Sequence, residues 1–181
     1  MIAMLRPIIL GMVIIFMSCE QDIPEEDVFD NPLDEDEVTY ETPALTFYPL
    51  DISIELGASQ TVDVFVLDVD DLAGSFVKID YDQIRLSVLS ITVGQFFSDA
   101  VQAPVFIAED DVENGIIEIN TSFLGSDSVS VSGTGSLASI VFQSTADGES
   151  SLMFDSSCEF VDPDDNVITI MGFGVGVVNA P

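Results

Sequence analysis

Residues 57–82 read GASQTVDVFVLDVDDLAGSFVKIDYD, and this stretch contains two segments in which apolar and polar side chains alternate. Apolar residues recur at every second position from Val62 to Val66 and again from Val77 to Tyr81. This period of two is typical of a half-buried β-strand. An Asp-rich turn closed by Gly74 is expected between the two segments. Adjacent strands with this spacing predict a β-sandwich.

The rest of residues 44–181 has the same character. It is rich in Val, Ile, Phe, Ser, Thr and Gly and has no long segment with a period of 3.6 residues. A stretch of this length suits one domain that buries roughly two-thirds of its unfolded surface. We therefore predict an all-β domain, with a short helical turn near 80–86 or 96–102.

The order of these motifs resembles the cohesin family. Gly57 is followed by a V-x-V-x-V strand, an L-x-G turn at Leu72 and Gly74, and a V-x-I-x-Y-D strand that ends at Asp82. Further segments follow the family order: 86–94, GIIEI at 115–119, GTGSLASIVF at 133–142, and the closing hairpin at 151–154 and 159–170. Residues 95–114 do not follow the pattern, so we predict no strand register there.

The resemblance implies a fold and a class of function. The fold is a sandwich of about nine strands in two sheets, of jelly-roll type, similar to the fold of some carbohydrate-binding modules. Cohesins are binding modules, so the resemblance implies a receptor for another protein and not an enzyme. The implied partner is a dockerin-like module, which bears calcium and belongs to an enzyme or scaffold.

In cohesins the partner lies across one flat sheet face, which includes the strands resembling 75–81 and 115–121. Carried over by pattern, one set of alternate positions faces the core: Val77, Ile79, Tyr81, Ile117 and Ile119. The other set faces outward and is predicted to contact the partner: Phe76, Lys78, Asp80, Glu118 and Asn120. The alternative is that a loop covers Phe76 or that the register slips by one residue, which would invert every side chain.

The first 18 residues have the features of a secretory signal. Arg6 precedes an apolar run from Pro7 to Met17, and the segment ends in Phe-Met-Ser before Cys19. The ending resembles a bacterial lipobox, which implies cleavage before Cys19 and lipidation of its thiol. The alternative is an uncleaved membrane helix, but the run is short for a span of ~20 residues and lacks a basic flank.

An acidic segment separates this cysteine from the sandwich. Residues 20–43 contain eleven Asp or Glu, three Pro and no Lys or Arg, a composition that buries too little apolar surface to fold. With Cys19 it forms a predicted tether, 19–43. Acidic residues after a lipidated cysteine also resemble surface-export signals of some Gram-negative lipoproteins, which predicts an outer-membrane protein at the cell surface. The alternative is a solubilising linker.

The charge of the chain excludes one class of partner. The net charge is −30, and residues 44–181 carry 22 acids against two bases, Lys78 and Arg85. Binding to nucleic acid needs a basic surface, so it is excluded as a function. The same lack of basic residues disfavours direct binding to anionic lipid, which leaves the lipid anchor as the predicted membrane contact.

Catalytic chemistry also has little support. The chain has no His, which removes the commonest general base, the Ser-His-Asp triad and most zinc sites. If Cys19 is lipidated, Cys158 has no partner for a disulfide and is expected to be a small buried hydrophobe. We predict neither catalytic residues nor a cofactor.

Calcium is the one metal that the composition suggests, at turns rich in Asp. Residues 162–166 place oxygens as an EF-hand loop begins, but Val167 stands where Gly is needed and Phe173 where a bidentate Glu is needed. A hairpin turn with Pro163 in its second position is the better interpretation. The weak calcium candidates are Asp68, Asp70, Asp162 and Asp164.

Two other functions remain open. A carbohydrate-binding lipoprotein would need exposed aromatic rings in line; the chain has no Trp, and the candidates are Tyr48, Phe76, Phe96 and Phe97. A structural envelope protein would show a long uncapped edge strand. A flat sheet face of mixed polar and apolar character would favour the protein receptor, which could serve in polysaccharide breakdown.

Overall fold

The computed structural model describes residues 40–98, 100–124 and 129–181. The predicted signal, Cys19 and most of the tether lie outside the described residues. Regular structure in the described part consists of β-strands and one 3-10 helix, Gln95–Phe97. None of its helices is long and apolar enough to cross a bilayer.

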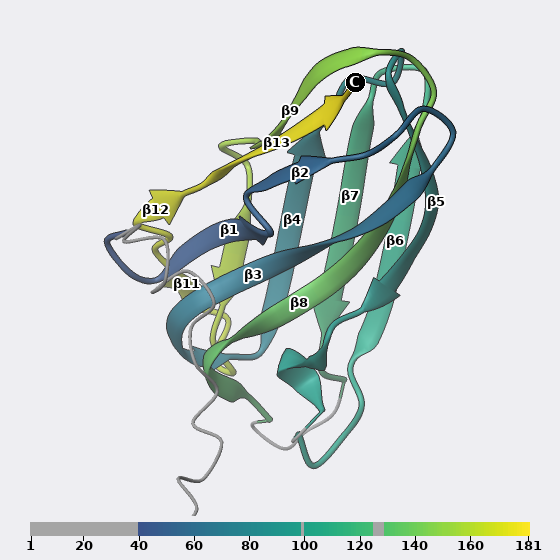
Figure 1. Ribbon diagram of the computed structural model, residues 1–181. Helices are drawn as coiled ribbons and strands as arrows, with labels where there is room; N and C mark the ends of the chain where they lie inside the picture. The colour runs from purple at the N-terminus through teal and green to yellow at the C-terminus, as the bar shows by residue number, and fades with distance from the viewer. Residues whose placement is uncertain (1–39, 99, 125–128) are drawn as a thin grey trace, which may run out of the picture. The chain divides into compact units, whose positions relative to one another are not determined.

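The strands form two sheets that pack face to face, and in Figure 1 the long strands β3 and β8 run diagonally across β4, β7 and β6. One sheet has the order β12-β1-β3-β8-β5. The other has the order β11-β10-β4-β9-β13-β2, with β7 paired to β4 and β6 paired to β7. The bounds are β1 Ala44–Tyr48, β2 Asp51–Ser53, β3 Ser59–Leu72, β4 Gly74–Asp80, β5 Leu86–Val93, β6 Val105–Asp111, β7 Ile116–Ser122, β8 Val131–Ser144, β9 Gly148–Phe154, β10 Glu159–Val161, β11 Val167–Ile168, β12 Gly172–Phe173 and β13 Val175–Ala180.

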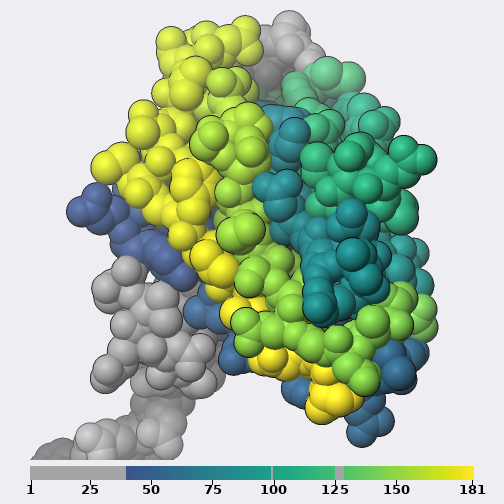
Figure 2. All heavy atoms as spheres, turned by 90° about the horizontal axis from the view of Figure 1, so that it is seen from above, coloured from purple at the N-terminus to yellow at the C-terminus, as the bar shows by residue number. Residues whose placement is uncertain are grey.

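The predicted all-β sandwich is confirmed. Nine strands have five or more residues (β1, β3 to β9 and β13), in agreement with the predicted number of about nine. The four additional segments, β2, β10, β11 and β12, have two or three residues each and extend the sheets at their margins. The space-filling view from above shows β13, in yellow, directly beside β9, in light green (Figure 2).

The core lies between the two sheets and is built from alternate positions along their strands. Val62, Val64 and Val66 of β3 are buried, as the period-two pattern predicted. On the opposite sheet, Phe154 stacks its ring on that of Phe47, with centroids 4.3 Å apart. A fully buried side chain, such as Val64 or Phe47, contributes about 1.5–3 kcal/mol relative to an exposed one.

The predicted Asp-rich turn before Gly74 is wrong, because β3 continues to Leu72 as a bulged strand. Asp68 and Asp71 have φ of 49° and 53°, at two shifts of register against β8. The Asp68 N–H donates to Thr134 Oγ1 at 3.0 Å, and the Asp71 N–H to Ser132 Oγ at 2.9 Å. Hydroxyl groups of β8 thus satisfy the amides that the bulges release. The chain crosses to the other sheet over a single residue between β3 and β4.

The two adjacent aromatic residues Phe96 and Phe97 are buried and do not form an exposed platform. They belong to the 3-10 helix, which begins one residue before the region 96–102 expected to hold a helical turn and overlaps its start. A Cβ at Gly135 would lie only 3.0 Å from the Phe96 ring, so the glycine in β8 makes room for this helix. Their assignment as candidate sugar-binding rings was therefore wrong.

A small apolar cluster lies outside the main core, around Phe65 and Leu67 of β3 and Ala44 of β1. Tyr40 is half-buried against this cluster, although the sequence analysis placed it in the tether. The Tyr48 ring meets the Phe65 ring edge-on, with centroids 6.0 Å apart. In the described part of the chain, packing thus extends to four residues before the first strand.

Candidate functional site

The register between β4 and β7 determines which residues face outward. Val77 pairs with Ile119, and both side chains are almost fully buried in the core. The intervening positions face outward, and Phe76 pairs directly with Asn120. The predicted orientation is therefore confirmed, and a slip of one residue is excluded. The structure brings all five predicted contact residues onto one face, where Lys78 pairs with Glu118 and Asp80 with Ile116.

The face continues onto the strands beside β4 and β7. Ile107 of β6 lies opposite Asn120, and Met153 of β9 lies opposite Asp80 and Val175. Ile107, Met153 and Val175 are 52%, 48% and 52% exposed. We call this surface the β4–β7 face, and it comprises Phe76, Lys78, Asp80, Ile107, Glu109, Ile116, Glu118, Asn120, Met153, Glu159 and Val175.

The charges on the β4–β7 face are unbalanced. Lys78 Nζ lies 3.5 Å from Glu118 Oε1. The chain has only two other basic residues, and Arg85 pairs with Asp82 instead. The face therefore sets one lysine against four carboxylates, a surface that attracts cationic groups.

The turn between β9 and β10 braces β4 at Lys78. The Asp155 N–H donates to the Lys78 carbonyl at 2.9 Å, and the Lys78 N–H donates to Cys158 Sγ at 3.3 Å. Burial raises the pKa of the Cys158 thiol. Cys158 is a free cysteine that packs against the core and is partly buried, where full burial was expected. The backbone under the face is thus fixed by hydrogen bonds on this side.

The weak calcium candidates are not brought together into a metal site. Asp162 Oδ1 accepts hydrogen bonds from the Asp164 and Asn166 N–H groups at 2.8 and 2.9 Å. The Asn166 side chain binds the other oxygen at 2.9 Å, which lowers the pKa of Asp162. These bonds close the β10–β11 hairpin, so the turn interpretation is confirmed. Asp68 accepts a hydrogen bond from Thr42, and Asp70 lies in β3. The described residues contain no group of three or more His, Cys, Asp or Glu that could hold a metal.

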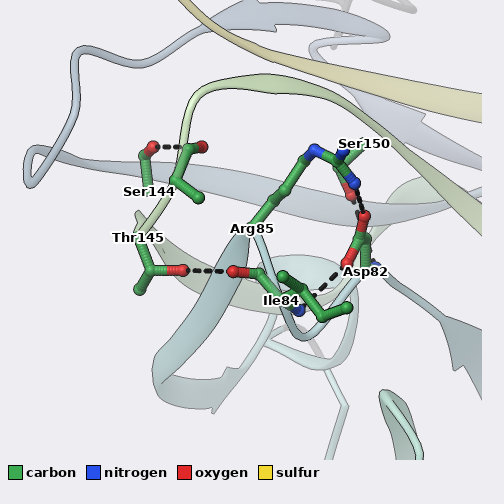
Figure 3. Close-up of polar contacts among 7 residues, drawn as sticks. Asp82, Ile84, Arg85, Ser144, Thr145 and Ser150 are labelled. Carbon is green, nitrogen blue, oxygen red and sulfur yellow. Dashed lines mark hydrogen bonds and ion pairs between the residues drawn. The ribbon is translucent and has the colours of Figure 1, made fainter.

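The sequence analysis did not predict a polar network at the end of β4, which surrounds the only other ion pair in the described part (Figure 3). Asp82 binds the Arg85 guanidinium and also accepts a hydrogen bond from the Ile84 N–H at 2.9 Å. Burial raises the pKa of Asp82, but the hydrogen bonds from Arg85 and Ile84 and the positive charge of Arg85 together outweigh burial, so the net pKa is lowered. Thr145 donates from Oγ1 to the Ile84 carbonyl at 3.0 Å. The D-x-x-R spacing is the signal that could have revealed this network, which closes the 82–85 turn.

Among the described residues two aromatic rings are exposed, Tyr48 and Phe173, and they do not lie in line. Tyr48 faces away from the core, where its ring meets Phe65. Phe173 is also exposed, but it pairs with the core-facing Leu45 and its ring lies 6.1 Å from that of Phe154. The two exposed rings therefore sit on opposite sides of their sheet. This arrangement does not supply the aligned platform that sugar binding needs.

Comparisons with solved structures identify the class of fold. A type II cohesin domain from the cellulosome of Acetivibrio cellulolyticus superposes with a TM-score of 0.65 at 15% identity, over 77% of this chain and 96% of that one. A non-cellulosomal cohesin from the archaeon Archaeoglobus fulgidus gives 0.62 at 19% identity, over 76% and 91%. The cohesin of a type I cohesin–dockerin complex from Clostridium thermocellum gives 0.63 at 19% identity, over 76% and 98%.

The sandwich is thus a cohesin-like domain, and the predicted fold is confirmed. No family model matches the chain, and no curated protein matches it. The likeness therefore lies in the three-dimensional fold, at sequence identities below one in five.

Proposed function

We propose that this protein is a non-catalytic receptor that binds a dockerin-like partner across the β4–β7 face. The observation that carries the proposal is the composition of that face, where exposed apolar side chains alternate with charged ones over adjacent strands in register. A mixed surface of this kind is typical of non-obligate protein interfaces. Several of the similar cohesins were solved as complexes with a dockerin, among them one from Acetivibrio cellulolyticus and one from Clostridium thermocellum.

The rigidity of the face supports the same function. Its strands are paired on both sides at β4 and β7, and the turn at Asp155 braces Lys78. A partner therefore meets a surface whose backbone is ordered before binding, so little conformational entropy is lost on association. Phe76, half-buried near the centre of the strand pair, is the aromatic residue best placed to anchor a contact.

Lipid anchoring at Cys19 is the second part of the proposal. The support is the sequence alone: an apolar leader, a cysteine after Ser18 and an acidic tether. An anchored cohesin would hold its partner at the outer surface of a bacterial envelope, where it would serve polysaccharide breakdown. Metabolic labelling with a palmitate analogue tests this, with Cys19→Ala as the control. Label on the wild type alone, together with protease accessibility on intact cells, supports the proposal; an unlabelled wild type contradicts it.

The binding proposal is tested by a pull-down from the native organism's extract with residues 40–181, with and without calcium. The matched control is a Phe76→Ala variant of the same fragment. Calcium-dependent capture of a protein with a dockerin-like repeat, reduced for the variant, supports the proposal. Binding to a glycan array without a protein partner would contradict it and favour the carbohydrate-binding alternative.

A further inference from the structure

Two carboxylates face one another on the β4–β7 face. Glu109 of β6 pairs directly with Glu118 of β7 in an antiparallel register, and both side chains point outward. Directly opposite residues place their Cβ atoms about 4.5–5.5 Å apart, and like charges at this spacing repel. The sequence offers no local reason for two acids at these positions. An opposed acid pair in the middle of a candidate interface suggests a role in recognition.

Only one of these carboxylates has a basic partner. Lys78 lies on the far side of Glu118, at 3.5 Å from Oε1. In the described part of the chain the ion pairs are Lys78–Glu118 and Arg85–Asp82, so Glu109 belongs to neither. The row across the three strands therefore reads acid, acid, base, with one negative charge uncompensated.

Apolar side chains flank this row on both sides. Ile107, more than half exposed, lies one row away in line with Asn120 and Phe76. Ile116 lies in the next row on the other side. A partner that covers these apolar groups must also remove water from the opposed carboxylates. Burying an uncompensated carboxylate costs several kcal/mol, so such a partner must supply a positive charge.

We propose that the partner's docking surface presents a Lys or Arg side chain that inserts between Glu109 and Glu118, with apolar neighbours that cover Ile107 and Phe76. This inference rests on the proposed function and specifies the chemistry of its partner. An arginine suits the site best, because its planar guanidinium can donate to two carboxylates at once. The same acidic row repels anionic lipid and nucleic acid.

The test compares three variants of residues 40–181: Glu109→Gln, Glu109→Lys and Glu55→Lys. Glu55 is exposed in the connection between β2 and β3, so Glu55→Lys makes the same charge change away from the face. The probe is the dockerin-bearing protein captured by the wild type, purified and titrated by calorimetry at low and physiological salt. Close interfacial charge pairs lead us to expect roughly 10-fold weaker binding for Glu109→Gln and roughly 100-fold or more for Glu109→Lys.

The outcomes separate this inference from the function on which it rests. The wild-type affinity should fall with salt, Glu55→Lys should bind almost as the wild type does, and Glu109→Gln should melt no lower than the wild type, since it removes a repulsion. A partner arginine changed to Glu should restore binding to Glu109→Lys. If Phe76→Ala loses the partner while Glu109→Lys keeps it, the acid pair has no role and the receptor function stands. If the wild type captures no dockerin-bearing protein, both fail.

Discussion

The Tyr81 hydroxyl donates a hydrogen bond of 2.7 Å to the Asp110 carboxylate, joining the end of β4 to the edge strand β6. Tyr81 is buried and Asp110 points inward from β6, so the bond lies in the margin of the core. An inward-pointing acid makes an edge strand a poor template for pairing with another chain. The hydroxyl lets β6 carry such an acid without leaving it unsatisfied.

Removal of this hydroxyl should destabilise the domain. In Tyr81→Phe the Asp110 carboxylate loses its bond, and we expect a loss of about 1–3 kcal/mol in the free energy of unfolding. Urea denaturation followed by circular dichroism measures it. Tyr48→Phe is the matched control, because that exposed side chain makes no hydrogen bond of this kind. Equal effects from the two variants would show that the bond to Asp110 contributes nothing.

The same pair should make stability fall at alkaline pH. Burial raises the pKa of Tyr81 above the ordinary tyrosine value of 10.0, and the hydrogen bond to Asp110 raises it further. The folded state therefore holds the phenolic proton more tightly than the unfolded state, so stability declines as pH rises above about 10. Denaturant midpoints between pH 8 and pH 11 should show a steeper decline for the wild type than for Tyr81→Phe. Parallel curves would contradict the assignment.

Two glycines with similar backbone angles offer a test of packing at the β6–β7 hairpin. Gly115 has φ of 69° and Gly57 has φ of 81°. An added Cβ would lie 2.3 Å from the Tyr81 carbonyl oxygen at Gly115, but would meet nothing within 4 Å at Gly57. Gly57→Ala should cost about 1–2 kcal/mol from backbone strain alone. Gly115→Ala should cost clearly more, because backbone must move; thermal denaturation of both variants checks the difference.

Much of this architecture was predictable from the sequence because alternation reports directly on which side of a strand is buried. Val77 and Ile79 are buried as their spacing indicated, and Phe76 and Lys78 alternate with them on the outer face. The hairpin at Asp162 followed from local turn signals in the same way.

The missed features depend on contacts between residues distant in the chain. Asp68 was predicted to lie in a turn because the segment is rich in Asp. Its positive φ suits a turn and a β-bulge equally well. The bulge is stabilised by the hydroxyl of Thr134, 66 residues later, which accepts a hydrogen bond from the Asp68 N–H. The opposition of Glu109 and Glu118 could not be predicted, because it requires the register of β6, in the one region where the motifs gave no guidance.

Added salt should stabilise the domain. Residues 44–181 carry 22 acids and two bases, so self-repulsion opposes the compact state at low ionic strength. Screening acts over about 8 Å at physiological ionic strength and weakens this repulsion. The melting temperature should rise from low to high NaCl, and choline chloride at equal ionic strength should raise it by the same amount. A flat response would contradict the prediction, and a larger effect of divalent cations than ionic strength explains would indicate specific binding.

Truncation of an inward side chain on β4 should lower stability, whereas truncation of an outward side chain should lower partner affinity. Val77 is almost fully buried, so Val77→Ala should cost about 1–3 kcal/mol of stability by opening a cavity. Phe76→Ala and Asp80→Ala act on the β4–β7 face and should each leave stability within about 1 kcal/mol of the wild type, since neither side chain enters the core. Phe76→Ala should instead weaken partner binding by about 1–2 kcal/mol, as expected for an aromatic contact residue. Calorimetric titration with the captured partner and thermal denaturation of the same samples separate the two effects. A loss of stability from Phe76→Ala equal to that from Val77→Ala would show that Phe76 serves packing rather than recognition.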